Sequence, residues 1–487
     1  MGLVRRWNLV ADLGLVLVCA LVAGLLGQDA NWDQLQYHYW YPWQLFHGGF
    51  TDPDLYGGRF QNPLPQVPFY LVASTLTPQV AQALLGALAG TAAVVARRIA
   101  LHLLPYAGGP QVAASVAAAA LAVVGAGFRT ELGTSYSDVL LTVLLLGSLL
   151  LVIGARPWPA LWAGVLAGAA VGLKYTTAPF AIAVLVALWV LPGRRLARTG
   201  LWVGGTLVGW LLTGGAWAWN LWRTYDSPTF PFWNTIFASP WYPSADLTDE
   251  RYGVDGIGQW LAWPWAMATG SARVLDLPVR DPRWLLLAAA VALIAAGWRR
   301  FPHPGRAVLA FTLVGLALWL AVFGVIRYAI PVEMTTAVLV VSALGLWLSP
   351  RATIALSLVL AVGAGLLTES ARSRRVEFSQ RWYEVDAEAF AAVRPGDTVL
   401  VDGQYPSTFM LPDALPPAVP VHVVQKDFTG TPLVSWLEQD LAAARQVWVV
   451  TGRPPSQVDP ALGTIEYNEC TRIRSNVVDR WLCPVKL

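Results

Sequence analysis

The stretch WNLVADLGLVLVCALVAGLLG, residues 7–27, decides the fold class, because it is apolar over a length sufficient to cross a membrane and contains a single charge, Asp12. It follows Arg5 and Arg6, as the apolar part of a secretory signal peptide would. However, no small-x-small cleavage pattern follows it, and many further apolar runs do. We therefore interpret residues 7–27 as a retained transmembrane helix.

The composition agrees with a protein that crosses a membrane many times. The chain has 487 residues, of which 56% are hydrophobic and only 13% are charged, and its mean hydropathy is +0.50. These values are too apolar for an ordinary soluble domain. The 25 tryptophans and 15 tyrosines suit repeated passage through the membrane interface. No basic domain or basic tail is present in the sequence, so a nucleic-acid partner is not expected.

Apolar runs of membrane-spanning type recur along the first 368 residues and predict a polytopic α-helical membrane protein with about eleven transmembrane helices. The runs are 8–27, 79–101, 111–128, 137–154, 158–173, 176–192, 200–219, 284–298, 307–325, 329–348 and 352–368.

The arginines near the ends of these runs orient the chain, because cytoplasmic ends of transmembrane helices are enriched in Arg and Lys. Every second connection between the runs lies on the same side as the N-terminus. The run ends on that side hold twelve arginines, and the loops there hold no acidic residue. The acidic residues before position 369 lie almost wholly on the opposite side. The arginines are Arg5, Arg6, Arg97, Arg98, Arg156, Arg194, Arg195, Arg198, Arg299, Arg300, Arg306 and Arg351. This distribution predicts a cytoplasmic N-terminus and an outer C-terminus.

Long segments occur only on the predicted outer side. Residues 1–368 would form the membrane domain, with outer loops at 28–78 and 220–283. The tail, residues 369–487, contains the strand-like runs DTVLVDG, VPVHVVQ and QVWVVTG and the helix-like run LVSWLEQDLAAAR. It is therefore predicted to be an extracytoplasmic soluble α/β domain.

Two of the three cysteines lie in this tail. Cys470 and Cys483 are 13 residues apart in strand-like sequence, whereas Cys19 lies in the first apolar run. An oxidising outer face favours a disulfide between Cys470 and Cys483, and the alternative is two unpaired thiols.

Ionisable residues beside a membrane are costly and mark functional sites. Five of them gather at the predicted outer ends of the helices: Asp33, then Glu131 and Asp138 in FRTELGTSYSD, Lys174 in GLKYTTAP and Arg327 in IRYAIPVE. A carboxylate can take a proton from an attacking hydroxyl, and fixed cations can neutralise charge on a phosphate leaving group. The set therefore suits a transfer reaction on an amphiphilic phosphate.

Structural roles are the alternatives for these residues. Asp33 precedes a helix-like run and could be an N-cap, and Lys174 and Arg327 could extend to lipid headgroups. Glu333 could pair with a buried cation or only brace the helices. His38 could be a metal ligand, an acceptor contact or a hydrogen-bonded interface residue.

Several motifs resemble bacterial glycosyltransferases of the C-type superfold (GT-C), the group that includes protein O-mannosyltransferases and aminoarabinose transferases. The motifs are WDQLQYH at 32–38, GLKYTTAP at 172–179, NLWRTYDSPTFPFWN at 220–234 and RYAIP at 327–331. The resemblance covers roughly the first 370 residues. It implies an inverting glycosyltransferase that moves a sugar from a polyprenyl-phosphate-linked donor to a glycan, lipid or protein acceptor.

The resemblance also implies roles for individual residues. Asp33 would be the catalytic base, Lys174 and Arg327 would bind the donor phosphate, and Asp138 would orient the acceptor. Asp33 and Asp138 would be the residues to hold a divalent metal ion. Supporting or acceptor-contacting residues would be Tyr37, His38, Glu131 and Tyr328. The sequence departs from the family in lacking an Asp-Glu pair after the first helix, and Asp29 is a competing acid.

By the same resemblance, the protein would lie in the inner membrane of a bacterium, with membrane lipids and the lipid-linked donor as its partners. Three other functions remain open from the residues alone. They are a transporter or flippase of lipid-linked sugars, an oligosaccharide ligase or polymerase with a pyrophosphate-linked donor, and an outer-surface binding protein whose tail is the active part.

Overall fold

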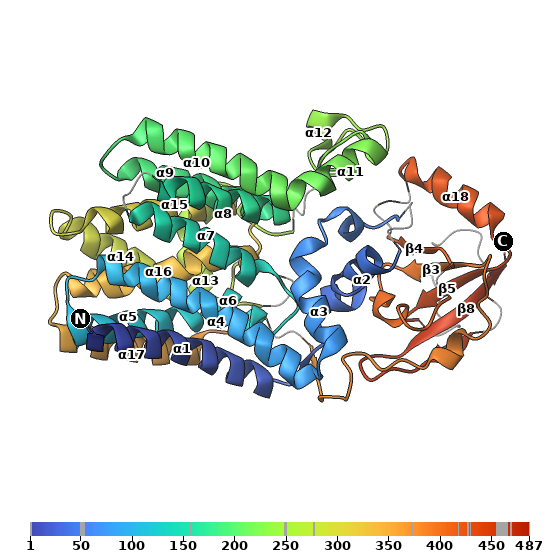
Figure 1. Cartoon of the computed structure of the whole chain (residues 1–487), viewed down its shortest axis with the longest axis horizontal. Coiled ribbons are helices and arrows are strands. Elements are labelled where there is room, and N and C mark those ends of the chain that lie inside the picture. Colours follow the sequence, from blue (N-terminus) through green and yellow to red (C-terminus); the bar gives the residue numbers. More distant parts are fainter. Residues whose placement is uncertain are drawn as a thin grey trace. The chain divides into compact units, whose positions relative to one another are not determined.

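The structure, a computed structural model of the chain (Figure 1), groups the residues into two compact units. The helical unit comprises Met1–Leu25, Gln82–Ala216 and Asp249–Ser373. The loop–tail unit comprises Leu26–Ala81, Trp217–Thr248 and Arg374–Leu487. The residues that the structure describes are 2–48, 54–154, 158–247, 251–275, 278–371, 374–416, 418–425, 428, 430–453, 466–467 and 470–486.

Each predicted apolar run has a helical counterpart. The helices are α1 (Gly2–Leu25), α4 (Pro78–Leu103), α5 (Gly108–Val123), α6 (Ala126–Glu131), α7 (Asp138–Ile153), α8 (Pro159–Leu173), α9 (Ala178–Val190), α10 (Arg195–Trp210), α13 (Ile257–Thr269), α14 (Arg283–Ala296), α15 (His303–Val322), α16 (Ile330–Gly345) and α17 (Pro350–Leu367). Within the described ranges, five segments are long and apolar enough to cross a membrane, and others are shorter apolar helices. The count of eleven spans therefore stays a prediction.

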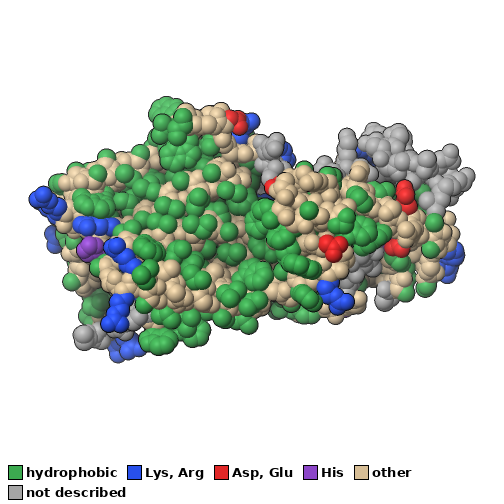
Figure 2. Space-filling view, turned by 90° about the horizontal axis from the view of Figure 1, so that it is seen from above, with side chains coloured by type: hydrophobic (Ala, Val, Ile, Leu, Met, Phe, Trp, Pro, Cys, Tyr) green, Lys and Arg blue, Asp and Glu red, His purple; other side chains and the backbone are tan. Residues whose placement is uncertain are grey.

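Large apolar side chains remain exposed on the outside of the helical unit, as expected where lipid replaces water. On α17, for example, Val362 and Leu366 are 64% and 81% exposed, whereas nearly every residue of α16 is buried. Figure 2 shows hydrophobic side chains spread over one face of the helices, with arginine and lysine side chains gathered at the left edge of the view. α16 is therefore a central helix of this unit.

Glycines set the spacing between α8 and α10. Gly164 and Gly168 lie one turn apart on α8, and Gly205 and Gly209 do so on α10. A Cβ atom built on Gly205 would lie 2.1 Å from the carbonyl oxygen of Leu161. This small-xxx-small pattern allows two backbones to approach closely inside a membrane.

We predict opposite effects of alanine at two adjacent glycines of α10. Gly205→Ala should lower the free energy of unfolding by about 1–3 kcal/mol, because the added methyl group meets backbone atoms that cannot move aside. Gly204→Ala is the matched control: its Cβ would meet nothing within 4 Å, and alanine is the better helix former by about 1 kcal/mol. Thermal unfolding of the detergent-solubilised protein measures both. Equal shifts for the two variants would contradict the proposed packing.

An ion network joins α1 to α4 near the arginine-rich end. Asp12 Oδ1 accepts a hydrogen bond of 2.8 Å from Arg97 Nε, and Arg98 pairs with the other oxygen of Asp12. Arg97 is fully buried. Arg97 and Arg98 therefore lie inside α4 and not in a loop, and both pair with Asp12. Arg156 lies outside the described residues.

The loop–tail unit contains a mixed sheet. Its strands are β3 (Thr398–Asp402), β4 (Val421–Val424), β5 (Val447–Thr451), β6 (Glu466–Tyr467), β7 (Thr471–Ile473) and β8 (Arg480–Lys486), with the order β4-β3-β5-β8-β6 and β7 also paired with β8. β3 is parallel to β4 and β5, and α18 (Leu433–Ala443) lies between β4 and β5 in the chain. The predicted tail strands and helix are confirmed as β3, β4, β5 and α18.

The first outer loop packs with the tail and shares its core. β1 (Gln28–Asp29) pairs antiparallel with β2 (Arg375–Val376). Leu35, Trp40 and Tyr56 belong to the same apolar cluster as tail residues such as Val401. The loop also contributes α2 (Trp40–His47), α3 (Val67–Thr75) and the short helices η2 (Gly57–Phe60) and η3 (Leu64–Gln66), and the second outer loop contributes α11 (Ala216–Tyr225) and α12 (Asn234–Phe237). The tail therefore completes its core with residues from far earlier in the chain.

Cys470 and Cys483 form a disulfide. Cys483 lies on β8, next to Val449 of β5, and is fully buried. The bridge fastens the chain just before β7 to β8, the strand that pairs with β5, β6 and β7. Cys19 is buried in α1 as a free thiol.

Candidate functional site

In the helical unit, Asp138 and Lys174 form a buried ion pair. Asp138 is the first residue of α7, and Lys174 follows the last residue of α8. Lys174 Nζ lies 2.7 Å from Asp138 Oδ1, and the side chains are only 18% and 5% exposed. The positions follow from the local sequence, because α8 ends at Leu173 and α7 begins after the turn GTSYS.

Two more predicted residues lie beside this pair. Arg327 and Tyr328 belong to η6 (Ile326–Ala329), the turn that precedes α16. The Lys174 ammonium lies 4.4 Å from the centre of the Tyr328 ring, and the Arg327 guanidinium lies 4.0 Å from the centre of the Tyr136 ring. Such cation–π contacts hold the cations in place without neutralising their charge. Tyr136, which the sequence reasoning missed, lies in the GTSYS turn.

Glu131 completes this group of residues. Its Oε2 accepts a hydrogen bond of 2.9 Å from the backbone N–H of Val139, and the negative charge of Asp138 acts on its carboxyl group. Burial, followed by the negative charge of Asp138, raises the pKa of Glu131 well above its usual value. Burial and a neighbouring negative charge both favour the neutral form of a carboxyl group. A neutral Glu131 would leave the group with one net positive charge.

We predict that Glu131→Gln preserves stability, because the amide reproduces a neutral carboxyl group, accepts from Val139 and donates to Asp138. Glu131→Ala should lower the free energy of unfolding by about 1–3 kcal/mol, since the buried N–H group of Val139 loses its hydrogen bond. Thermal unfolding in detergent checks both variants. A Gln variant as unstable as the Ala variant would show that Glu131 is ionised in the folded protein.

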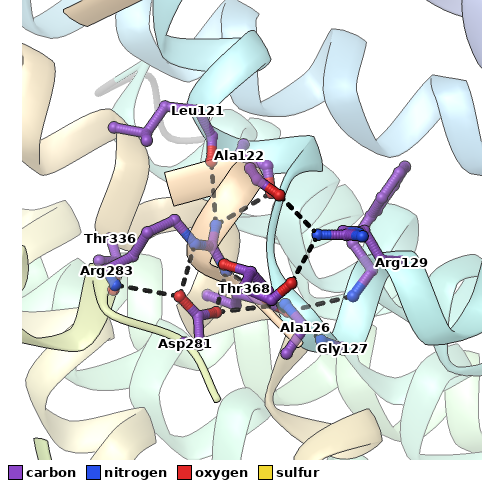
Figure 3. Close-up of polar contacts among 12 residues, drawn as sticks. Leu121, Ala122, Ala126, Gly127, Arg129, Asp281, Arg283, Thr336 and Thr368 are labelled. Carbon is purple, nitrogen blue, oxygen red and sulfur yellow. Dashed lines mark hydrogen bonds and ion pairs between the residues drawn. The ribbon is translucent and has the colours of Figure 1, made fainter. Parts of the chain in front are cut away.

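The helical unit contains a second set of buried charges. We call Asp281, Arg283 and Glu333 the buried ion cluster. All three side chains are at most 2% exposed. Arg283 Nη2 lies 2.6 Å from Asp281 Oδ2 and also pairs with Glu333. Its Nη1 donates to the carbonyl oxygens of Leu121 and Ala122, at 3.0 and 3.1 Å (Figure 3). Glu333 thus pairs with a buried cation, which was one of its two expected roles.

The buried ion cluster supplies hydrogen-bond partners for the backbone groups where α5 ends and α6 begins. The cation lies at the last carbonyl groups of α5, while the two carboxylates accept from the first N–H groups of α6, those of Ala126, Gly127 and Phe128, at 3.2–3.3 Å. This is the arrangement that helix dipoles favour. A Cβ atom on Gly125 would lie 1.6 Å from Glu333 Oε1, so only glycine fits between the two helices. The cluster therefore fixes α6, which ends in Glu131.

In the loop–tail unit, Asp33 lies at the start of η1 (Gln34–His38), a short π-helix. It makes no capping hydrogen bond with its side chain. The cap is supplied by Asn31, whose Oδ1 accepts from the backbone N–H of Gln34 at 2.9 Å. The N-cap alternative for Asp33 is therefore wrong. π-helical turns occur frequently at functional sites.

Asp33 is half-buried and lies against Tyr56. Burial raises the pKa of Tyr56 well above its ordinary value, and the charges of Asp33 and Asp54 raise it further. Trp32 and Tyr37 also approach this ring, with centroid distances of 6.4 and 6.0 Å. Tyr37 and Asp33 thus border the same phenol.

Asp29, the competing acid, has a different environment. It is fully buried, and its Oδ2 accepts a hydrogen bond of 2.6 Å from Asn31 Nδ2. Its backbone belongs to β1, which pairs with β2. Asp29 therefore supports the segment, while the more exposed Asp33 is the better placed to meet a substrate.

His38 is buried, and its ring meets Tyr37 edge to face at 4.5 Å. Among the residues that the structure describes, no three His, Cys, Asp or Glu side chains are grouped to hold a metal ion. Asp33 and Asp138 belong to different units. A shared metal site therefore remains a prediction from the sequence.

Two buried charged residues of the first outer loop were missed by the sequence reasoning. Asp54 Oδ1 accepts a hydrogen bond of 2.6 Å from the backbone N–H of Val423, and its Oδ2 accepts from Tyr41. Arg59 is 1% exposed and lies over the Trp217 ring at 5.7 Å. The available signal was that both are charged residues in a long loop without apolar periodicity. A charge that becomes buried in such a loop requires a partner.

The structure thus brings the predicted residues together in two groups. Glu131, Asp138, Lys174, Arg327 and Tyr328 lie together in the helical unit, and Asp33, Tyr37 and His38 lie together in the loop–tail unit. The expectation that both groups act on one substrate stays a prediction.

The solved structures with similar folds include ArnT from Cupriavidus metallidurans. Its complex with undecaprenyl phosphate has a TM-score of 0.59 to this chain at 12% sequence identity, and the match covers 98% of this chain and 97% of ArnT. The apo form has a TM-score of 0.56 over the same shares of both chains. No family model and no curated protein sequence matches the chain. The resemblance to GT-C transferases is therefore confirmed at the level of the fold.

Proposed function

We propose that this protein is a glycosyltransferase of the GT-C superfold that transfers a sugar, with inversion, from a polyprenyl-phosphate carrier to an acceptor at the outer face of a bacterial inner membrane. One observation carries the proposal: the fold matches, over nearly the whole of both chains, a protein crystallised with undecaprenyl phosphate. The two groups of buried and half-buried charges supply the residue types that this chemistry needs.

Asp33 is the proposed general base. It takes the proton of the acceptor hydroxyl, whose oxygen then attacks the anomeric carbon of the donor sugar. The bond from that carbon to the phosphate oxygen breaks, and the polyprenyl phosphate leaves with the bonding electrons. Attack from the side opposite the leaving group inverts the anomeric centre. A positioned base of this kind contributes about 10²- to 10⁴-fold to the rate.

Lys174 and Arg327 are the proposed phosphate ligands. Asp138 offsets one of the two cations, and the burial that raises the pKa of Glu131 disfavours a second negative charge there. The group therefore keeps one net positive charge for an anionic phosphate. Because the group is largely removed from water, this charge stabilises the leaving phosphate more strongly than an exposed cation would.

We predict that Asp33→Asn abolishes sugar transfer, with a loss of at least about 100-fold, while donor binding is kept. The asparagine preserves the size of the side chain but cannot accept the proton. Purified protein in lipid nanodiscs, incubated with a panel of polyprenyl-phosphate sugars with and without chelator, measures transfer and donor hydrolysis. Glu438→Gln, a charge removal at an exposed position of α18, is the control and should keep full activity. An active Asp33→Asn enzyme would exclude Asp33 as the base.

A double variant separates phosphate binding by Lys174 from simple pairing with Asp138. Lys174→Met alone leaves a buried carboxylate unpaired, which destabilises the protein. Lys174→Met combined with Asp138→Asn removes both charges together. If Lys174 binds the donor phosphate, this double variant should bind donor roughly 10- to 100-fold more weakly. Binding of a polyprenyl-phosphate sugar in nanodiscs checks the prediction. Unchanged affinity would mean that the lysine serves only Asp138.

The alternative functions differ in whether a covalent bond of the lipid-linked sugar is broken and in which donor is used. A transporter or flippase would move the lipid-linked sugar without cleaving it, and a ligase or polymerase would require a pyrophosphate-linked donor. Removal of the tail is a poor test of a tail-based function, because the tail packs against the segment that carries Asp33. Product analysis with the donor panel distinguishes these functions.

A further inference from the structure

A pocket of about 610 Å³ opens in the loop–tail unit. Its walls come from the first outer loop at Tyr39 and from the tail at residues 380–381, 383–387, 409–410, 412–414 and 474–476. The volume lies within the range of small-molecule sites. None of the residues to which we assign base or phosphate-binding roles is among its described lining residues.

One wall of the pocket is aromatic. Tyr39 meets Tyr383 edge to face at a centroid distance of 4.8 Å, and Tyr383 meets Phe409 at 4.8 Å and 43°. Tyr39 and Tyr383 are partly exposed, whereas Phe409 is buried behind them. Such a surface offers apolar ring faces beside phenolic hydroxyl groups.

The opposite wall is polar and rigid. Residues 384–386 run antiparallel to residues 474–476, with backbone hydrogen bonds from Asp386 to Arg474 and from Asn476 to Glu384 at 3.0 and 3.1 Å. The Asn476 side chain adds bonds to the backbone N–H of Glu384 and to Ser379 Oγ, at 2.9 and 2.6 Å. The pocket is therefore formed before any ligand enters, which lowers the entropic cost of binding.

The charges of the lining exclude two kinds of ligand. Two arginines, Arg381 and Arg474, face three carboxylates, Glu384, Asp386 and Asp413. A site for a phosphate group would carry an excess of cations, and a site for an acyl chain would lack these charges. Guanidinium and carboxylate groups beside aromatic rings suit a neutral ligand with many hydroxyl groups, because each hydroxyl group can both donate and accept a hydrogen bond.

The pocket is connected to the candidate base through one short segment. Tyr39 follows Asp33 by six residues and lies directly after η1. The Tyr383 hydroxyl donates to the carbonyl oxygen of Gln34, the residue next to Asp33, at 3.5 Å. A ligand in the pocket would therefore contact the same segment that presents Asp33.

We propose that this pocket binds a neutral saccharide portion of the acceptor. That the ligand is a neutral saccharide rests on the pocket alone. That this saccharide belongs to the acceptor rests on the proposed function. The tail then acts as the acceptor-recognition part of the enzyme. Its rings cover the C–H faces of the sugar, while Asp413 and Arg474 meet its hydroxyl groups.

The test measures binding in full-length Asp33→Asn protein in nanodiscs, so that no transfer is needed for the readout. The probes are an array of neutral oligosaccharides of hexose and N-acetylhexosamine, the same saccharides bearing phosphate or sulfate, and micellar polyprenyl phosphate. Neutral saccharides should bind best. Arg474→Ala, Asp413→Ala and Tyr39→Leu should each weaken the strongest one roughly 5- to 30-fold. Arg472→Ala, an exposed arginine two residues from Arg474 that pairs with Asp479, is the matched control and should bind normally.

Two results would overturn the saccharide site: preference for the charged probes, or neutral binding that all three pocket variants leave unchanged. Assays with Asp33 restored test the acceptor role separately. The pocket variants should raise the KM for the saccharide acceptor and leave hydrolysis of the donor by water unchanged. Failure of the enzyme to use any donor would remove the proposed function but not the saccharide binding, so the two failures are distinguishable.

Discussion

The requirement that a buried charge be paired governs the helical unit. Arg283 could not remain at 2% exposure without the carboxylates of Asp281 and Glu333. The same three side chains also satisfy the carbonyl end of α5 and the N–H end of α6. One cluster therefore joins α5, α6, α14 and α16. The placement of Glu131 at the end of α6, and of Arg327 just before α16, depends on it.

The candidate base is held by different means. The segment around Asp33 is fixed by the tail: Gln36 Oε1 accepts from the backbone N–H of Ser407 at 2.9 Å, and the carbonyl oxygen of Gln36 accepts from the Thr408 hydroxyl. Rigid support of this kind is what a catalytic group requires, because a small displacement of the base lowers the rate strongly. The tail is thus part of the site's framework, whatever else it binds.

The sequence predicted the helices well because lipid imposes a simple rule, a long apolar run for each span. It also predicted β3, β4, β5 and α18 from alternating and apolar patterns. It could not predict the partners of its charges. In the sequence, Arg283 looks like an ordinary arginine at a helix end, and Gly125 looks like an ordinary glycine of a turn. Whether Asp29 or Asp33 is the buried acid depends on strand pairing over a distance of more than 300 residues, which no local pattern records.

The shared core of the first loop and the tail also sets the order of events during synthesis. The side chain of Gln28 bonds to the carbonyl oxygen of Trp382, a separation of 354 residues. At typical translation rates of 5–20 residues per second, the loop waits roughly 20 to 70 s for its partner strands. The Asp33 segment can complete its packing only after the tail residues that it contacts have been synthesised. Ordering of this segment is therefore a late event in the folding of the chain.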